Sequence, residues 1–206
     1  MRGRLQSCLL VLLLSPPVDA AAQSRFKFFP PDSETRPTEC PLAPVSDFEN
    51  GWFSGQLSAA GEPSLYEQSL KQPAGVVSSY RFTWLRSFHA PIMIRIDERP
   101  GGLMQLTAKR LTGKGGYDPG HVGSTVNRPL TAQEGQDIRR LFSASDFKTF
   151  KVDTSVVGLD GAQWILETRL GNKYCVANQW SPTDGPVRRI GMMLLSLTGW
   201  KTETIY

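Results

Sequence analysis

Residues 164–180, WILETRLGNKYCVANQW, predict a β-hairpin, and this hairpin decides the fold class. Gly and Asn at 171–172 form a two-residue turn of the kind that joins antiparallel strands. With the turn at this place, Glu167 lies opposite Val176 on the partner strand. Successive strand residues point to opposite faces of a sheet, so the hairpin has one apolar face and one mixed face. The apolar face carries Trp164, Leu166, Cys175 and Ala177, and the mixed face carries Ile165, Glu167, Tyr174, Asn178 and Trp180.

The same alternation of apolar and polar residues recurs earlier in the chain and predicts further strands. These strands lie at 79–88, 92–97, 103–111 and 122–126. Ser46 and Thr131 each begin a Ser/Thr-x-x-Glu capping box, which predicts a helix after each of them. Pro186 suits the first turn of a last helix. Together these elements predict an α+β fold: a single domain with a mainly antiparallel sheet of five to seven strands and about three helices packed on one face.

The N-terminal 1–22 stretch has the pattern of a secretory signal peptide. Arg2 and Arg4 precede a short apolar run at 8–14, and small alanines follow at 20–22. The run is much shorter than the ~20 apolar residues that span a bilayer. We therefore expect a periplasmic or secreted protein that is soluble and has no transmembrane segment after signal cleavage.

Behind the signal peptide, residues 23–45 are rich in proline and predict an extended arm or linker. A single domain over 46–206 follows it. After cleavage the chain retains Cys40 and Cys175, which can form a disulfide in an oxidising compartment. The alternative is two unrelated thiols, with Cys175 packed inside a strand.

Three stretches of the chain resemble a known family: YRFTWLRSFHAP at 80–91, LTAKRLTGKGGYDPG at 106–120, and GLDGAQWILETRLGNKYCVANQWSP at 158–182. They resemble a family of exported bacterial proteins of unknown function, and the similarity runs from about Trp52 to the C-terminus. The resemblance implies export and a single domain. It implies no activity, cofactor or catalytic residue, and the proline-rich arm lies outside it.

The sequence contains no motif that names a reaction, such as a P-loop, HExxH, GxSxG, CxxC or GxGxxG. The formal net charge is +4 without a cluster of Lys and Arg, so we expect no nucleic-acid partner. His89 and His121 lack the spacing to cysteines that zinc sites use, so we expect no metal and no cofactor.

Two charged residues lie where a strand pattern is apolar and therefore need partners. Arg86 shares the parity of an aromatic stripe, and Glu167 lies midway along its predicted strand. Either such residues pair across the sheet or face water, or Arg86, His89 and Glu167 form a shared polar pocket. The glycine-rich segment at 113–120 is either a flexible surface connection or an anion-binding loop with exposed amides.

The leading hypothesis is a non-catalytic binding module for a protein or envelope glycan, which it contacts through the mixed sheet face and the glycine-rich segment. The candidate ligand-binding residues are Arg86, Lys114, Tyr117, Tyr174 and Trp180. The alternative is a small periplasmic hydrolase in which His89, Glu62 or Glu167 acts as acid or base; Glu62 and Glu167 suit a carboxylate pair for glycoside chemistry. A third class is a structural component of a larger assembly.

Overall fold

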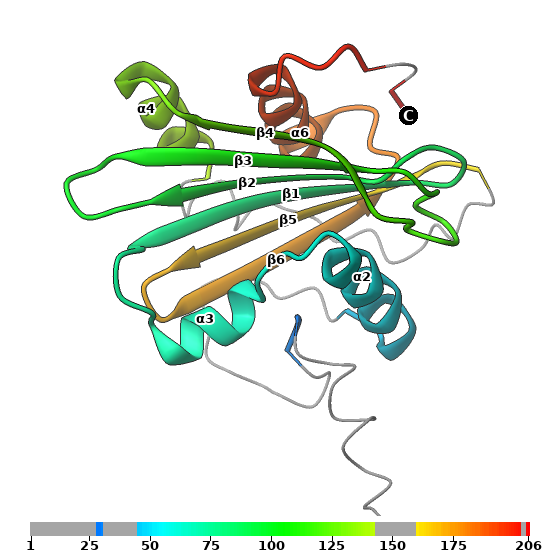
Figure 1. The fold of residues 1–206 in the computed structure, drawn as a ribbon, viewed down its shortest axis with the longest axis horizontal. Coiled ribbons are helices and arrows are strands. Elements are labelled where there is room, and N and C mark those ends of the chain that lie inside the picture. The colour runs from blue at the N-terminus through cyan, green and yellow to red at the C-terminus, as the bar shows by residue number, and fades with distance from the viewer. Residues whose placement is uncertain (1–27, 31–44, 143–159, 203–204) are drawn as a thin grey trace, which may run out of the picture.

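The computed structural model describes residues 28–30, 45–142, 160–202 and 205–206. Their centre is a six-stranded antiparallel sheet in the order β4-β3-β2-β1-β5-β6, with four helices packed on it (Figure 1). The strands are β1 (Ser78–Arg86), β2 (Ile92–Glu98), β3 (Met104–Leu111), β4 (Val122–Pro129), β5 (Ala162–Leu170) and β6 (Lys173–Trp180). The helices are α2 (Asp47–Ala59), α3 (Leu65–Lys71), α4 (Ala132–Leu141) and α6 (Gly185–Leu197). The predicted α+β class and antiparallel sheet are confirmed.

The predicted hairpin is present as β5 and β6, and its register is the predicted one. Glu167 lies opposite Val176, and Ile165 lies opposite Asn178. The turn between the strands contains Gly171 with a φ of 59°, a backbone conformation that glycine adopts without strain. β1 pairs with β2 on one side and β5 on the other, and each of its residues is buried. This central position fixes where every charged residue of β1 can point.

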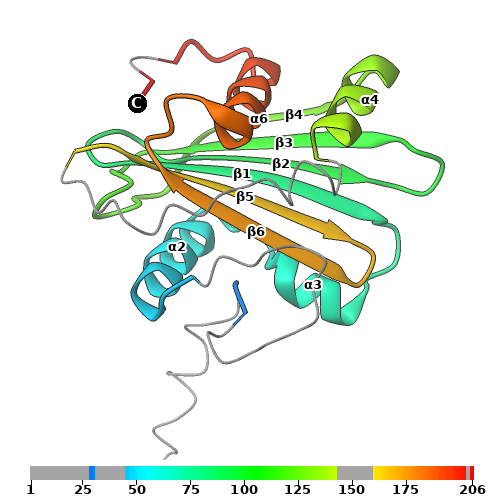
Figure 2. The ribbon, with the colours of Figure 1, turned by 180° about the vertical axis from the view of Figure 1, so that it is seen from behind.

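Helices cover both faces of the sheet, as the two opposite views show (Figures 1 and 2). α4 and α6 cover one face, and their apolar residues pack against the predicted stripe of Tyr80, Phe82 and Trp84. α2 and α3 cover the other face, where Leu85 and Ile165 belong to a second core. About three helices on one face were expected. The described residues instead have four helices, two on each face, because both sides of the strands carry apolar residues.

Local signals place the starts of α2, α4 and α6 as predicted, whereas α3, which begins after Ser64, was not predicted. Ser46 caps α2 by accepting the Glu49 backbone N–H, and the Glu49 carboxylate accepts the Ser46 backbone N–H in return. Thr131 and Glu134 form the same reciprocal pair at the start of α4. Each box satisfies two of the N–H groups that a helix start leaves unpaired.

The predicted signal peptide at 1–22 and most of the arm at 23–45 lie outside the described residues. Within the arm, Phe29 is fully buried and packs edge-on against Phe53 of α2, with ring centroids 5.9 Å apart. Cys175 is disulfide-bonded, and its predicted partner Cys40 lies outside the described residues. In the part of the chain that the structure describes, no helix has the length and apolar character needed to cross a membrane.

Candidate functional site

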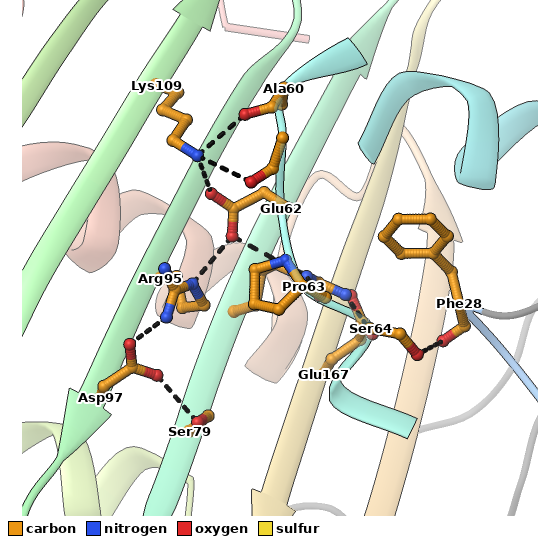
Figure 3. Close-up of polar contacts among 12 residues, drawn as sticks. Phe28, Ala60, Glu62, Pro63, Ser64, Ser79, Arg95, Asp97, Lys109 and Glu167 are labelled. Carbon is orange, nitrogen blue, oxygen red and sulfur yellow. Dashed lines mark hydrogen bonds and ion pairs between the residues drawn. The ribbon is translucent and has the colours of Figure 1, made fainter. Parts of the chain in front are cut away.

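Two of the predicted acid–base residues, Glu62 and Glu167, meet in a buried ion network on the face that α2 and α3 cover (Figure 3). Arg81 of β1 joins them. The Glu167 carboxylate accepts hydrogen bonds from Arg81 Nε at 2.6 Å and from Arg81 Nη2 at 2.7 Å. Glu62 Oε2 lies 3.8 Å from Arg81 Nη1, and all three side chains are at most 1% exposed. These three side chains are therefore closed to solvent.

Glu62 has two further cationic partners on neighbouring strands. Arg95 Nε of β2 donates to Glu62 Oε2 at 2.8 Å, and Lys109 Nζ of β3 lies 2.8 Å from Glu62 Oε1. Arg95 also pairs with Asp97, which accepts the Ser79 hydroxyl at 2.8 Å (Figure 3). Burial favours the neutral form of Glu62, but its three cationic neighbours outweigh burial and hold the pKa of Glu62 below its ordinary value. Glu62 is therefore ionised at neutral pH.

The other end of the network includes Tyr174 of β6, whose hydroxyl donates to Glu167 at 2.8 Å. Burial, reinforced by the Glu167 charge, raises the pKa of Tyr174 well above its ordinary value. Burial opposes the charge of Arg81, but its ion pair with Glu167 raises the pKa of Arg81. Because both carboxylates are buried and paired with cations, the arrangement gives no support to an acid–base role for Glu62 or Glu167. It fastens the connection between α2 and α3 to the sheet.

Carboxylates that are paired with cations make the free energy of unfolding depend on pH. Hydrogen bonds from Arg128, then those from Thr131, lower the pKa of Glu134 from 4.5 to about 2, and the pKa of Glu62 is also lowered. A carboxyl group whose pKa is lower in the folded state binds its proton more weakly there than in the unfolded state. Its contribution to the free energy of unfolding is therefore present above the pKa of the unfolded state, and it is lost as the pH falls through the pKa of the folded state. We therefore expect the free energy of unfolding to fall between about pH 4.5 and 2.

Urea unfolding at neutral and acidic pH measures this loss, and Glu134→Gln makes the loss smaller. Glu67→Gln is the matched control, because Glu67 forms an exposed i,i+4 pair with Lys71, a type of pair that stabilises little. A stability that is unchanged on acidification, or a Glu134→Gln variant with the full loss, contradicts the assignment.

Arg86 and His89 lie away from the network, in a pocket of about 350 Å³ at the end of the sheet where β1 ends and β2 begins. The lining residues share a basic character, and none of those that the structure describes is Asp or Glu. The basic lining residues are Arg86, His89, Arg110, Lys114 and Lys201. We call this cavity the basic pocket. Phe88, Ala90, Thr112, Gly113 and Thr202 complete its described lining.

The two arginines of the basic pocket each lie against a tryptophan ring. Arg86 Cζ is 4.4 Å from the ring centroid of Trp84, and Arg110 Cζ is 4.6 Å from that of Trp200. Cation–π contact of this kind holds the flat face of a guanidinium and leaves its N–H edge for other partners. One such partner of Arg86 is the Ala90 carbonyl, which accepts from Nη2 at 2.7 Å. The pocket thus has guanidinium groups whose orientation is set before any ligand arrives.

The glycine-rich segment at 113–120 brings Lys114 into the pocket and is anchored there. The Gly115 carbonyl accepts from Trp52 Nε1 at 2.7 Å and from Gln56 Nε2 at 3.1 Å, and the Gly115 N–H donates to the His89 carbonyl. A Cβ at residue 115 would lie 2.5 Å from the Arg86 backbone nitrogen, so only glycine fits this approach. The two predicted interpretations were a flexible surface connection and an anion-binding loop with exposed amides. The anchoring contradicts the first, and the N–H groups of residues 113–115 donate to carbonyls of the chain, which contradicts exposed amides at these positions, so we call the segment the fixed loop.

The structure separates the remaining predicted site residues. Glu167 pairs with Arg81, its register partner, and lies on the opposite sheet face from Arg86 and His89. Tyr174 is buried against Tyr66 of α3, so this part of the mixed face is covered. Tyr117 is 70% exposed and does not line the basic pocket, and the half-buried Trp180 packs over Gly161. Arg86, His89 and Lys114 come together at the basic pocket, and Glu62, Glu167 and Tyr174 come together in the buried ion network.

Sequence reasoning missed Arg81, Arg110 and Lys201. Arg81 has the same signal as Glu167, a charge in the middle of an apolar strand, but the polar residues Thr83 and Ser87 on its side suggested a solvated face. Arg110 and Lys201 have no local signal, because they come from β3 and from the segment after α6 and meet only in the folded chain.

His89 also contacts the last residue of the chain. His89 Nδ1 lies 2.5 Å from the Tyr206 hydroxyl, and the Tyr206 main-chain oxygen accepts from Trp164 Nε1 at 3.0 Å. These contacts hold the chain end beside the basic pocket. Within the described residues, no three His, Cys, Asp or Glu side chains are grouped to hold a metal ion. In comparisons with known proteins, no family model and no curated protein matches the chain.

Proposed function

We propose that the protein is an exported, non-catalytic binding module that holds an anionic ligand in the basic pocket. The observation that carries the proposal is the charge of the lining: two arginines, two lysines and a histidine, with no acidic side chain among the described lining residues. The predicted signal peptide at 1–22 supports the exported part of the proposal.

The electrostatics of the basic pocket favour an anion. Cations that line one cavity repel one another, and a bound anion removes this repulsion while it gains hydrogen bonds from each of them. Arg86 is 5% exposed, so water solvates its charge poorly and the guanidinium depends on polar partners, one of which is the Ala90 carbonyl that accepts from Nη2 at 2.7 Å. The volume of about 350 Å³ is typical of pockets that bind small molecules.

The non-catalytic part of the proposal has separate support. Glu62 and Glu167, the two carboxylates proposed as acid or base, are buried in ion pairs on the other face of the sheet. A general acid or base must lie within hydrogen-bond reach of its substrate. His89, the third residue proposed as acid or base, does line the basic pocket, but its Nδ1 already lies 2.5 Å from the Tyr206 hydroxyl, and no carboxylate is among the described lining residues. We therefore expect a ligand of the basic pocket to be recovered chemically unchanged.

Calorimetric titration at low salt with inorganic phosphate, citrate, glucose 6-phosphate and uncharged glucose tests the proposal. We expect at least one of the three anions to bind and glucose alone to be inert. Arg110→Gln weakens the binding roughly tenfold or more, because a hydrogen bond to a charged group contributes ~1.5–3 kcal/mol.

Arg140→Gln is the matched control for Arg110→Gln. Arg140 is an exposed arginine of α4 paired with Asp137, and it is not among the lining residues. The Arg140→Gln variant changes the net charge by the same amount as Arg110→Gln. Because residue 140 lies outside the basic pocket, we expect the affinity of this variant for the anion to stay close to that of the unaltered protein. Binding that is absent for every anion, or equal losses in the two variants, overturns the proposal.

A further inference from the structure

We infer that the protein binds the surface of an anionic membrane through a group of exposed aromatic rings beside the basic pocket. This inference rests on the proposed function, because it names an anionic lipid headgroup as the ligand of the basic pocket. Its support comes from the exposure of the rings, from their place next to the pocket, and from lining cations that are open to solvent.

Four aromatic residues make up this group, which we call the aromatic surface: Phe48 and Trp52 of α2, Phe88 after β1, and Tyr117 of the fixed loop. Phe48 is 78% exposed, Tyr117 is 70% exposed and Phe88 is 49% exposed, whereas Trp52 is half-buried. Single exposed apolar residues are common on soluble proteins, but a gathering of large ones marks a contact surface. The aromatic surface therefore indicates a partner that covers these rings.

The fixed loop joins α2 to the basic pocket. Trp52 Nε1 donates to the Gly115 carbonyl at 2.7 Å, and the centroid of the Trp52 ring lies 6.2 Å from that of Phe48. α2 lies at the end of the sheet where β3 leads into the fixed loop (Figures 1 and 2). Phe48 and Trp52 are thus connected by direct contacts to a loop that lines the basic pocket.

Tyr117 and Phe88 belong to the same surface because their chain neighbours pack together. A Cβ at Gly116 would lie 3.0 Å from the Ser87 carbonyl oxygen, so the two backbones are in contact. Tyr117 follows Gly116 in the chain, and Phe88 follows Ser87. Of the exposed rings, only Phe88 lines the basic pocket. A ligand confined to the pocket therefore covers Phe88 at most, and a larger partner is needed to cover Tyr117 and Phe48.

Three cations of the basic pocket are open to such a partner. Lys114 and Lys201 are exposed and Arg110 is half-buried, and no ion-pair partner of theirs lies among the described residues. Lys114 is close to the aromatic surface, because its carbonyl accepts the Tyr117 N–H at 3.1 Å. Arg86 is buried and bonded to the chain itself, so it adds its charge to the field but makes no contact with the partner.

The charges at this end of the molecule favour an anionic partner. Asp47 and Asp118, the chain neighbours of Phe48 and Tyr117, are exposed and bring two negative charges. The two arginines and two lysines of the basic pocket outnumber them, so positive charge is in excess. Basic residues near an anionic membrane strengthen its attraction to the protein, and dissolved salt weakens that attraction.

The types of residue favour a membrane over a protein partner. The core of a protein interface is rich in aromatic residues and arginine but poor in lysine. Aromatic rings beside lysines and arginines are instead typical of surfaces that bind membranes, where the rings enter the headgroup layer and the charged side chains meet anionic lipids. Lys114 and Lys201 have long stems that reach headgroups around the rings.

Co-sedimentation with lipid vesicles tests the inference, with the full chain after removal of residues 1–22. One set of vesicles contains phosphatidylglycerol and phosphatidylcholine in equal amounts, and the other contains phosphatidylcholine alone. We expect binding to the anionic vesicles to be at least about tenfold tighter, and to weaken as salt is added. Equal binding to both sets overturns the inference.

The small anions of the calorimetric titration separate this inference from the proposed function. If citrate or phosphate binds but the anionic vesicles do not, the inference fails and the proposed function stands. If no small anion binds, the proposed function fails, and this inference fails with it. Soluble polyglutamate stands in for an acidic protein, and tighter binding of polyglutamate than of the anionic vesicles overturns the inference in favour of a protein partner.

The contribution of the rings is tested by Phe48→Ala and Tyr117→Ala. We expect each variant to bind the anionic vesicles roughly five- to tenfold more weakly, because a large apolar side chain no longer leaves water for the membrane. Neither residue lines the basic pocket, so we expect both variants to bind the small anions as the unaltered protein does.

Leu103→Ala is the matched control for the two ring variants. Leu103 is 73% exposed and lies between β2 and β3, at the opposite end of the sheet from the fixed loop. We expect it to bind the vesicles normally. A loss in Leu103→Ala as large as that in Phe48→Ala, or unchanged vesicle binding by both ring variants, overturns the role of the aromatic surface.

Discussion

Glu167→Gln lowers the free energy of unfolding by about 3–5 kcal/mol, the cost of removing one partner from a buried ion pair. The loss is large because Arg81 keeps its charge in a site with no exposure to water. After the change, the nearest carboxylate is Glu62, whose Oε2 is 3.8 Å from Arg81 Nη1 and already accepts from Arg95. Urea unfolding at neutral pH, followed by circular dichroism, measures the difference.

Two further variants show whether the loss comes from the unpaired charge. Glu98→Gln removes one partner of a pair with Arg139, whose side chain is 40% exposed, and we expect a change below about 1 kcal/mol. The double variant Arg81→Met, Glu167→Leu removes both charges of the buried pair and recovers much of the stability. If the free energy of unfolding of Glu167→Gln is within about 1 kcal/mol of that of the unaltered protein, then Arg81 and Glu167 do not form a buried ion pair in solution.

Gly115→Ala displaces the fixed loop and weakens anion binding by more than about tenfold, equivalent to ~1.4 kcal/mol. The added methyl group would lie 2.5 Å from the Arg86 backbone nitrogen and 2.8 Å from its carbonyl oxygen, and a strand at the centre of the sheet cannot move away. The loop therefore shifts and carries Lys114 with it. Stability falls by about 1–3 kcal/mol, as for other overpacked sites.

Gly55→Ala is the matched control for Gly115→Ala. Gly55 lies inside α2, and a Cβ there meets no atom within 4 Å. Alanine is the better helix former, so we expect this variant to be about 0.5–1 kcal/mol more stable and to bind the anion normally. Normal binding by Gly115→Ala contradicts the role of the fixed loop.

The hairpin and the helix starts were predictable because the signals for them are local. A two-residue turn fixes which residues of β5 and β6 are opposite each other, and a capping box needs four consecutive residues. Helix α2 was predicted, but α3 was not, and neither was the covering of the second sheet face by these two helices. The Ser79–Ser87 stretch alternates tyrosine, phenylalanine and tryptophan with arginine, threonine, leucine and serine, and the polar members of the second set suggest a solvated face.

The candidate site was predictable in part for a related reason. Arg86, His89 and Lys114 stand out in the sequence because each breaks or ends a local pattern. The pairing of Glu167 depends on the register of β1 against β5, and Arg81 and Glu167 are 86 residues apart in the sequence. No turn connects these strands directly, so the choice of Arg81 over Arg86 was not readable from sequence.

The two groups of charges differ in how far their influence extends into solution. The buried ion network contains three acidic side chains, Glu62, Asp97 and Glu167, and three basic ones, Arg81, Arg95 and Lys109, so its field cancels at short range. The basic pocket has no such cancellation among its described lining residues. We therefore expect an approaching anion to be drawn to one end of the sheet before it makes contact, and its rate of capture to decrease as dissolved salt screens that field.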